Sequence, residues 1–94
     1  MKQYYVYITT NPRKTTLYIG VTNDLRRRLA EHYTDRGNDA DFASKFHCYN
    51  LIFYETFGDI LVAIAREKYL KSLSRNQKES IINEINPLWE FLDY

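Results

Sequence analysis

The chain has 94 residues, of which 45 % are apolar and 27 % are charged, a composition typical of a globular domain that excludes a disordered or low-complexity chain. Its single cysteine excludes an internal disulfide and a cysteine-based zinc cluster, and it has no apolar run long enough for a membrane span or for the core of a secretory signal. The net charge of +1 hides an asymmetry: residues 1–36 carry seven basic and three acidic side chains (+4), and residues 37–94 carry six and nine (−3).

These counts predict a single domain over residues 1–94, located in the cytoplasm and without a membrane partner. An anionic partner is expected on the basic N-terminal half, although solvated helix faces also acquire uneven charge by chance.

The first predicted element is a β-hairpin. Residues 3–10 and 16–22 are rich in β-branched and aromatic side chains and are predicted to be strands. Asn11-Pro12 starts a short turn between them, so the strands should pair antiparallel. Side chains of matching parity share a face of such a pair, which brings Tyr7 and Tyr18 into contact.

A short helix is predicted after Asn23-Asp24, which is a good N-cap, with Leu25, Leu29 and Tyr33 as its apolar stripe. The polar segment 34–50 follows and contains an aromatic patch, Phe42 and Phe46, that has the form of a helical turn. Four tyrosines outside the candidate site are expected to pack in the core: Tyr4, Tyr33, Tyr54 and Tyr69.

The rest of the chain contains a third strand and two helices. Residues 51–57 are predicted to be the strand, and a helix should run from about Ile60 to Leu73. Ser74 and Gln77 form a capping box that opens the last helix, which ends before Asn86-Pro87. The predicted fold is α/β: a small sandwich with a three-stranded antiparallel sheet flanked by helices, in the order β-β-α-β-α-α.

Arg28 and His32 stand out on the first helix. At 100° per residue, Arg28 lies about 60° from Leu25, on the rim of the apolar stripe, and His32 follows one turn later on the same edge. A snorkelling arginine and a surface histidine are the structural alternatives for this pair.

Glu67 is the second anomaly, because it projects from an apolar helix face. Ile60, Ala63, Ile64 and Leu70 all lie within about 60° of it around the helix axis. A carboxylate there needs a cation or a metal ion, so an ion pair with an arginine and a metal site are equally compatible with this position.

These side chains are expected to converge on one face of the sheet, where they would form a phosphodiester site. Tyr7 and Tyr18 could accept a water proton, Arg28 could neutralise phosphate charge with His32 beside it, and Glu67 could bind a hard divalent ion.

Five short motifs occur in order along nearly the whole chain. They are Tyr5-Val6-Tyr7, Tyr18-Ile19-Gly20, the set Leu25, Arg28 and His32 in a Leu-x-x-Arg-x-x-x-His pattern, the segment 65–71 around Glu67, and Asn86-Pro87. This ordered set resembles that of the GIY-YIG nuclease family, and in particular its small single-domain bacterial branch.

The resemblance implies hydrolysis of DNA phosphodiester bonds, on branched, damaged or single-stranded DNA and in repair or recombination. It implies that Tyr7 accepts a proton from the attacking water with Tyr18 beside it, and leaves open which tyrosine is the base. Arg28 would stabilise charge on the phosphate, and His32 would assist by hydrogen bonding or proton transfer.

The resemblance also implies that Glu67 holds Mg²⁺ or Mn²⁺, that Asn86 supports the metal site through hydrogen bonds, and that Gly20 keeps the strand surface open for the substrate. The exposed basic side chains expected to contact the DNA backbone are Arg13, Arg26, Arg27 and Lys45.

Two residues depart from the family pattern. Tyr5 replaces the leading glycine of the first motif, and Val21 stands where the excision-repair branch has a lysine. Two other functions are compatible with the sequence: a nucleic-acid-binding module of the same fold without catalysis, and a structural domain in which Arg28 and Glu67 form an internal ion pair.

Overall fold

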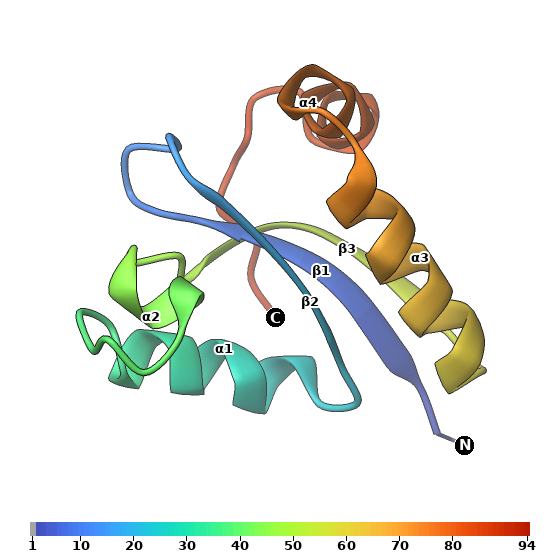
Figure 1. Ribbon diagram of the computed structural model, residues 1–94, viewed down its shortest axis with the longest axis horizontal. Coiled ribbons are helices and arrows are strands. Elements are labelled where there is room, and N and C mark those ends of the chain that lie inside the picture. The colour runs from blue at the N-terminus through green and yellow to red at the C-terminus, as the bar shows by residue number, and fades with distance from the viewer. Residues whose placement is uncertain (1) are drawn as a thin grey trace.

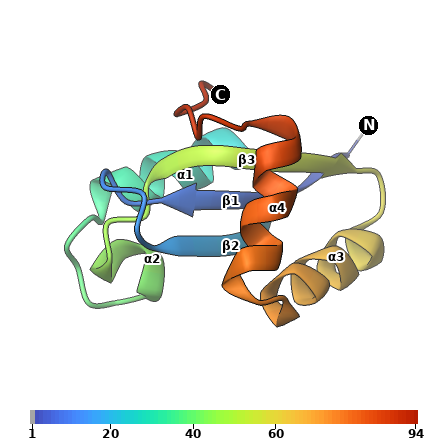
Figure 2. The same cartoon turned by 90° about the horizontal axis from the view of Figure 1, so that it is seen from above.

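The computed structural model describes residues 2–94, in which three antiparallel strands form one sheet. β1 (Tyr4–Thr10) pairs with β2 (Leu17–Thr22) on one side and with β3 (Asn50–Phe57) on the other, giving the strand order β2-β1-β3 (Figure 2). Each strand lies where β-branched and aromatic side chains are concentrated in the sequence. The hairpin and the third strand are therefore confirmed.

Four helices cover the two faces of this sheet (Figure 1). α1 (Leu25–Thr34) and the single-turn helix α2 (Phe42–Lys45) lie on one side, and α3 (Ile60–Ser72) and α4 (Arg75–Ile85) lie on the other. The predicted α/β sandwich is confirmed, and the helical turn at Phe42 adds one short element to the predicted order.

The side chains of the strands divide into two packed layers. The face under α3 and α4 holds the larger core, in which Val6, Ile8 and Ile19 of the hairpin pack with buried residues of β3, α3 and α4. The opposite face, under α1, holds Tyr7, Leu25 and Leu51. This second layer contains the tyrosines that the alternation of β1 and β2 placed together.

A β-bulge in β3 connects the sheet to the C-terminal segment. Ile8 pairs with Phe53 and Thr9 pairs with Leu51, so Ile52 is the extra residue. Its carbonyl accepts a hydrogen bond from the Asn86 amide at 2.9 Å. The neighbouring Leu51 carbonyl accepts one from the Leu92 backbone at 2.7 Å. The segment after α4 is thereby held along the edge of β3, and Leu92 packs in the layer under α1.

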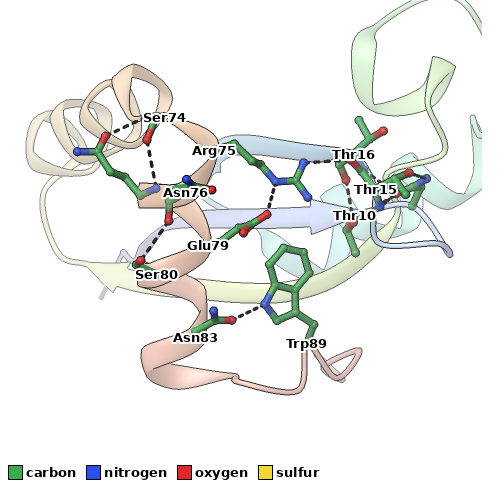
Figure 3. Close-up of polar contacts among 12 residues, drawn as sticks. Thr10, Thr15, Thr16, Ser74, Arg75, Asn76, Glu79, Ser80, Asn83 and Trp89 are labelled. Atoms are coloured by element: carbon green, nitrogen blue, oxygen red, sulfur yellow. Dashed lines mark hydrogen bonds and ion pairs between the residues drawn. The ribbon is translucent and has the colours of Figure 1, made fainter.

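α4 is fixed by contacts near its first turn (Figure 3). Ser74 and Gln77 form the predicted capping box. Arg75 donates to the Thr15 carbonyl of the hairpin turn at 3.0 Å and is paired with Glu79 at 2.8 Å. This contact joins α4 to the hairpin across the sheet.

Several packing predictions were wrong. Tyr33, Tyr54 and Tyr69 are 52, 38 and 53 % exposed, so of the four predicted packing tyrosines Tyr4 alone lies against the core. On α1 the buried residues are Leu25, as predicted, and His32, whereas Tyr33 is exposed and packs edge-on against Tyr49.

None of the helices in residues 2–94 has the length and apolar character needed to cross a membrane.

Candidate active site

A buried hydrogen bond between Tyr7 and His32 forms the centre of the candidate site. The Tyr7 hydroxyl lies 2.9 Å from His32 Nε2, and both residues are at most 1 % exposed. Tyr7 comes from the middle strand and His32 from the inner face of α1. The pair therefore joins α1 to the sheet through a phenol and an imidazole, which are both groups that can exchange protons.

Gly20 allows this pair to form. It is the direct partner of Tyr7 in the β1–β2 register, and a Cβ atom built on it would lie 2.5 Å from the Tyr7 hydroxyl and 2.6 Å from Cζ of the ring. The phenol thus lies directly over the glycine. Gly20 was expected to keep the strand surface open for the substrate, but it makes room for Tyr7.

Tyr18 and Arg28 complete the cluster. The Tyr18 ring centroid lies 6.1 Å from that of Tyr7 and 5.4 Å from that of His32. Arg28 is partly buried, with 29 % of its side chain exposed, and lies beside both phenols, where Glu31 pairs with it at 3.3 Å. The structure therefore brings together Tyr7, Tyr18, Arg28 and His32, as the sequence predicted for these four residues.

Burial determines the protonation of the central pair. Desolvation, and then the positive charge of Arg28, lower the pKa of His32 to about 4, so the imidazole is neutral near pH 7. Desolvation also raises the pKa of Tyr7 well above that of a free tyrosine. Tyr7 is thus a protonated phenol that shares a hydrogen bond with the neutral imidazole at His32 Nε2.

Arg28 carries the positive charge of the cluster. Burial alone would lower its pKa, but the interactions with Tyr7, Tyr18 and Glu31 outweigh burial and raise it. The guanidinium is accessible enough to meet an anion and is held in place by three neighbours. This is the environment in which an arginine fork binds phosphate oxygens.

Glu67 belongs to α3, the helix that covers the face of the sheet opposite α1 (Figure 1). Its side chain is 15 % exposed and is paired with Lys71 at 3.3 Å, one turn along the helix. Its predicted place on an apolar helix face is confirmed, because the flanking Ala63 and Leu70 are buried. It was also expected on the same face of the sheet as the phenols, but its helix covers the opposite face. The alternative of an internal ion pair between Glu67 and Arg28 is wrong, because Glu67 pairs with Lys71 and Arg28 pairs with Glu31.

Asn86 holds the C-terminal segment through three side-chain hydrogen bonds. Its amide nitrogen donates to the carbonyls of Ile52 and Glu90, both at 2.9 Å, and its side-chain oxygen accepts from the Glu90 backbone at 3.0 Å. Both ends of the amide are engaged, so the structure shows a clamp between the bulge of β3 and the C-terminal segment where support of a metal site was expected.

The structure shows what the two residues that depart from the family pattern, Tyr5 and Val21, contact. Tyr5 lies edge-on to Tyr54 and Tyr94, and its hydroxyl donates to Gln3 at 3.0 Å. Val21 packs against the apolar core under α3.

The predicted backbone contacts are all exposed: Arg13 in the hairpin turn, Arg26 and Arg27 in the first turn of α1, and Lys45 on α2. The first turn of α1 contains no acidic residue. Positive side chains at this end oppose the helix dipole, so the arginines weaken the helix while making its start attractive to anions.

The side chains of the site could hold a metal ion in one way, through a single carboxylate. Among residues 2–94, no group of three or more His, Cys, Asp or Glu side chains could enclose a metal. Mg²⁺ and Mn²⁺ are often held by one or two carboxylates together with water and substrate phosphate oxygens. Glu67, with a largely buried carboxylate, fits that arrangement as the single protein ligand.

One neighbour of the cluster was not assigned to the site from the sequence. Phe42 of α2 stacks on Tyr18 with centroids 6.4 Å apart and an interplanar angle of 22°. The spacing of Asp41 and Ser44 is the local signal, because the Asp41 side chain caps α2 by accepting from the Ser44 backbone at 2.9 Å. That cap predicts the helical turn but does not indicate where the turn packs.

The family model of the GIY-YIG catalytic domain matches residues 3–80. A UPF0213 protein of Natronomonas pharaonis is 37 % identical over 79 residues, which are 84 % of this chain and 89 % of that protein. A UPF0213 protein of Pectobacterium carotovorum is 34 % identical over 87 residues, covering 87 % of this chain and 80 % of that one.

A solved structure is also similar. The solution NMR structure of a UPF0213 protein from Bacillus halodurans has a TM-score of 0.60 and 27 % identity to this chain, and covers 94 % of this chain and 90 % of its own. The match extends over the sheet and the helices on both of its faces.

Proposed function

The chain belongs to the GIY-YIG catalytic domain family, and we propose that it is a divalent-metal-dependent endonuclease that hydrolyses DNA phosphodiester bonds. The observation that carries the proposal is the cluster around the buried Tyr7–His32 hydrogen bond, with Arg28 partly exposed beside it. A buried polar pair with a cation at its rim is the kind of arrangement that stabilises charge developing on a phosphate.

Each residue of the cluster has a role that its burial suggests. Arg28 binds a non-bridging phosphate oxygen, because its guanidinium is the cation that solvent reaches. Tyr18, which is partly exposed, is the phenol placed to contact an attacking water molecule. Tyr7 is fully buried and hydrogen-bonded to His32, so its proposed role is to hold the side chains of Tyr18 and Arg28 in place.

Mg²⁺ or Mn²⁺ at Glu67 would supply Lewis-acid stabilisation of the phosphate and of the departing oxygen. The burial of Glu67 supports this assignment, because a carboxylate on an apolar helix face costs free energy unless a cation neutralises it. Lys71 neutralises it in the structure described here.

A second function is favoured by one observation. Within residues 2–94, Glu67 makes no hydrogen bond or ion pair with the Tyr7–His32 cluster, and its helix α3 covers the opposite face of the sheet from α1. A domain that binds nucleic acid through Arg28 and the exposed basic residues without cleaving it would be compatible with that separation.

Cleavage of supercoiled, single-stranded and branched DNA with Mg²⁺ or Mn²⁺ distinguishes the two functions. The proposed nuclease should nick at least one substrate, and Arg28→Ala and Glu67→Ala should each reduce the rate by about two orders of magnitude or more. Arg28→Lys keeps the charge and loses the bidentate fork, so it should recover only part of the rate.

Matched controls separate this activity from a contaminant. Glu84→Ala removes an exposed carboxylate from α4 and should cleave at the wild-type rate. Equal nicking by wild type, Arg28→Ala and Glu67→Ala would show that the activity comes from another protein. Binding of DNA that depends on Arg28, together with no cleavage under any of these conditions, would establish the binding module instead.

A further inference from the structure

Two phenylalanine rings on α2 are exposed next to the candidate active site. Phe42 is 49 % exposed and Phe46 43 % exposed, and their ring centroids lie 4.6 Å apart. We call these two residues the aromatic shelf. Because Phe42 stacks on Tyr18, the shelf is continuous with the Tyr7–His32 pair.

The shelf is not what holds α2 against the protein. Ala43, Ser44 and Cys48 are buried and attach this segment, and the backbone of Gly37 donates to the Ser44 carbonyl at 2.7 Å. About half of each phenylalanine ring is left in water. The two rings are in contact with each other and form one continuous apolar patch.

Two cations lie near the shelf, on a surface that also holds the Asp41 carboxylate at the start of α2. The Lys45 ammonium lies 5.6 Å from the centroid of the Phe46 ring. On the other side, Arg28 lies beside Tyr18. Aromatic faces alternating with cations are the combination with which proteins bind single strands, because bases stack on the rings and phosphates pair with the cations.

We propose that the aromatic shelf binds an unpaired nucleobase of a DNA strand, adjacent to the phosphate held at Arg28. This inference rests on the proposed function and adds a substrate class to it. A base within a duplex has both faces covered by its neighbours, so stacking on the shelf requires a single strand, a flap or an extruded base. The protein should therefore prefer DNA with unpaired nucleotides near the scissile position.

Binding without cleavage tests the shelf directly. Fluorescence anisotropy in EDTA measures the affinity of a labelled 12-nucleotide single strand and of the corresponding duplex. Phe42→Leu keeps an apolar side chain on α2 and removes the ring face. It should weaken single-strand binding by about 5- to 150-fold, the range expected for the loss of one base–aromatic stack. Duplex binding should be unchanged.

Two further variants and an abasic series sharpen the result. Phe42→Trp should retain single-strand affinity, and Tyr69→Leu, which removes an exposed ring from α3, should have no effect. Moving an abasic site along the strand should weaken wild-type binding at one or two positions and leave Phe42→Leu insensitive. Melting temperatures show whether each variant is folded.

Equal affinities of wild type and Phe42→Leu for the single strand, or equal losses on single strand and duplex, would overturn the inference. Tighter binding of the same sequence as RNA, with the same sensitivity to Phe42→Leu, would overturn the assignment to DNA. Failure of the proposed function has a separate signature, because it removes cleavage in the metal-containing assay while the shelf results in EDTA still hold.

Discussion

At the scale of single residues, the close approach of Gly20 and Tyr7 is the most exacting feature of the site. The phenol occupies the volume that any other side chain at position 20 would need. The hydrogen bond to His32 holds the ring there, so the position of the ring is determined from both sides. A site organised in this way should respond sharply to one added methyl group.

Gly20→Ala tests that constraint. The new methyl group would displace the Tyr7 ring and lengthen its bond to His32, so we expect a loss of about 1–3 kcal/mol in the free energy of unfolding, typical of overpacking. Gly58→Ala is the control, because no atom of residues 2–94 other than its chain neighbours lies within 4 Å of a Cβ built there. Urea denaturation of both variants provides the comparison. Equal stability of the two would contradict the steric explanation.

His32 makes stability depend on pH. With its folded-state pKa near 4 against an ordinary value of 6.5, the unfolded chain binds a proton that the folded chain excludes between these values. Stability therefore falls as pH drops through this window, by roughly 3 kcal/mol in full and with no further contribution below about pH 4. The difference in unfolding free energy between pH 7.5 and 4.5 should shrink in His32→Gln. Parallel pH curves for wild type and variant would show that burial does not suppress protonation of His32.

The burial of His32 was within reach of sequence reasoning. At 100° per residue, His32 is about 20° from Leu25 around the helix, whereas Tyr33 is about 80° away. Tyr33 was predicted to belong to the apolar stripe with Leu25 and Leu29, but it is exposed. The imidazole tolerates burial because Tyr7 supplies a hydrogen-bond partner, and that contact comes from another element of the fold.

At the scale of elements, local signals set the helix ends correctly. Asp24, Asp59 and Ser74 cap α1, α3 and α4 through their side chains, and each is recognisable from a few neighbouring residues. The β-bulge at Ile52 leaves no such signal, because it arises from pairing between β1 and β3. Asn86 was accordingly recognised from the sequence, but its bond to Ile52 was not.

Asn86→Ala should loosen the C-terminal segment. It removes three hydrogen bonds and leaves the Ile52 carbonyl and the Glu90 amide in need of partners, so we expect a loss of about 2–4 kcal/mol. Hydrogen exchange should show faster exchange at Leu92, whose amide bonds to Leu51, with much less change at the centre of β1. Uniform acceleration of exchange across the sheet would indicate that Asn86 stabilises the whole fold and not only the C-terminal segment.

Two carboxylates that contact α3 should differ in their effect on stability. Glu55 of β3 binds Arg66 of α3 through both oxygens, at 2.8 and 3.2 Å, so Glu55→Ala should cost about 1 kcal/mol. Glu67→Ala removes a largely buried carboxylate whose partner Lys71 is half-exposed and one turn away on the same helix, so stability should change by less than about 0.5 kcal/mol or rise. Thermal melting of the two variants measures the contrast. A large loss in Glu67→Ala would assign that side chain a structural role.

At the scale of the whole molecule, the two sheet faces carry different parts of the candidate chemistry. The hairpin and α1 place the phenols, His32 and Arg28 in one layer, and α3 places Glu67 in the other. Spacing within a helix predicts which residues share its face, but which face of the sheet a helix covers depends on how the whole chain packs. For that reason the cluster of four could be predicted from the sequence, while the separation of Glu67 could not.

The uneven charge of the chain has its consequence at this same scale. The net +4 of residues 1–36 lies mostly on the hairpin turn and on α1, and α1 covers the face that contains the candidate site. Backbone contacts by exposed cations release counterions from DNA, so binding should weaken linearly with salt on a double-logarithmic plot. Titrations of a duplex at 50 to 200 mM salt should give that slope, and Arg26→Ala should reduce its magnitude by about 1, uniformly across DNA sequences. Lys78→Ala on α4 provides the matched control and should leave the slope unchanged. A slope that responds to Lys78→Ala and not to Arg26→Ala would place the DNA on the α4 side of the sheet, away from Arg28.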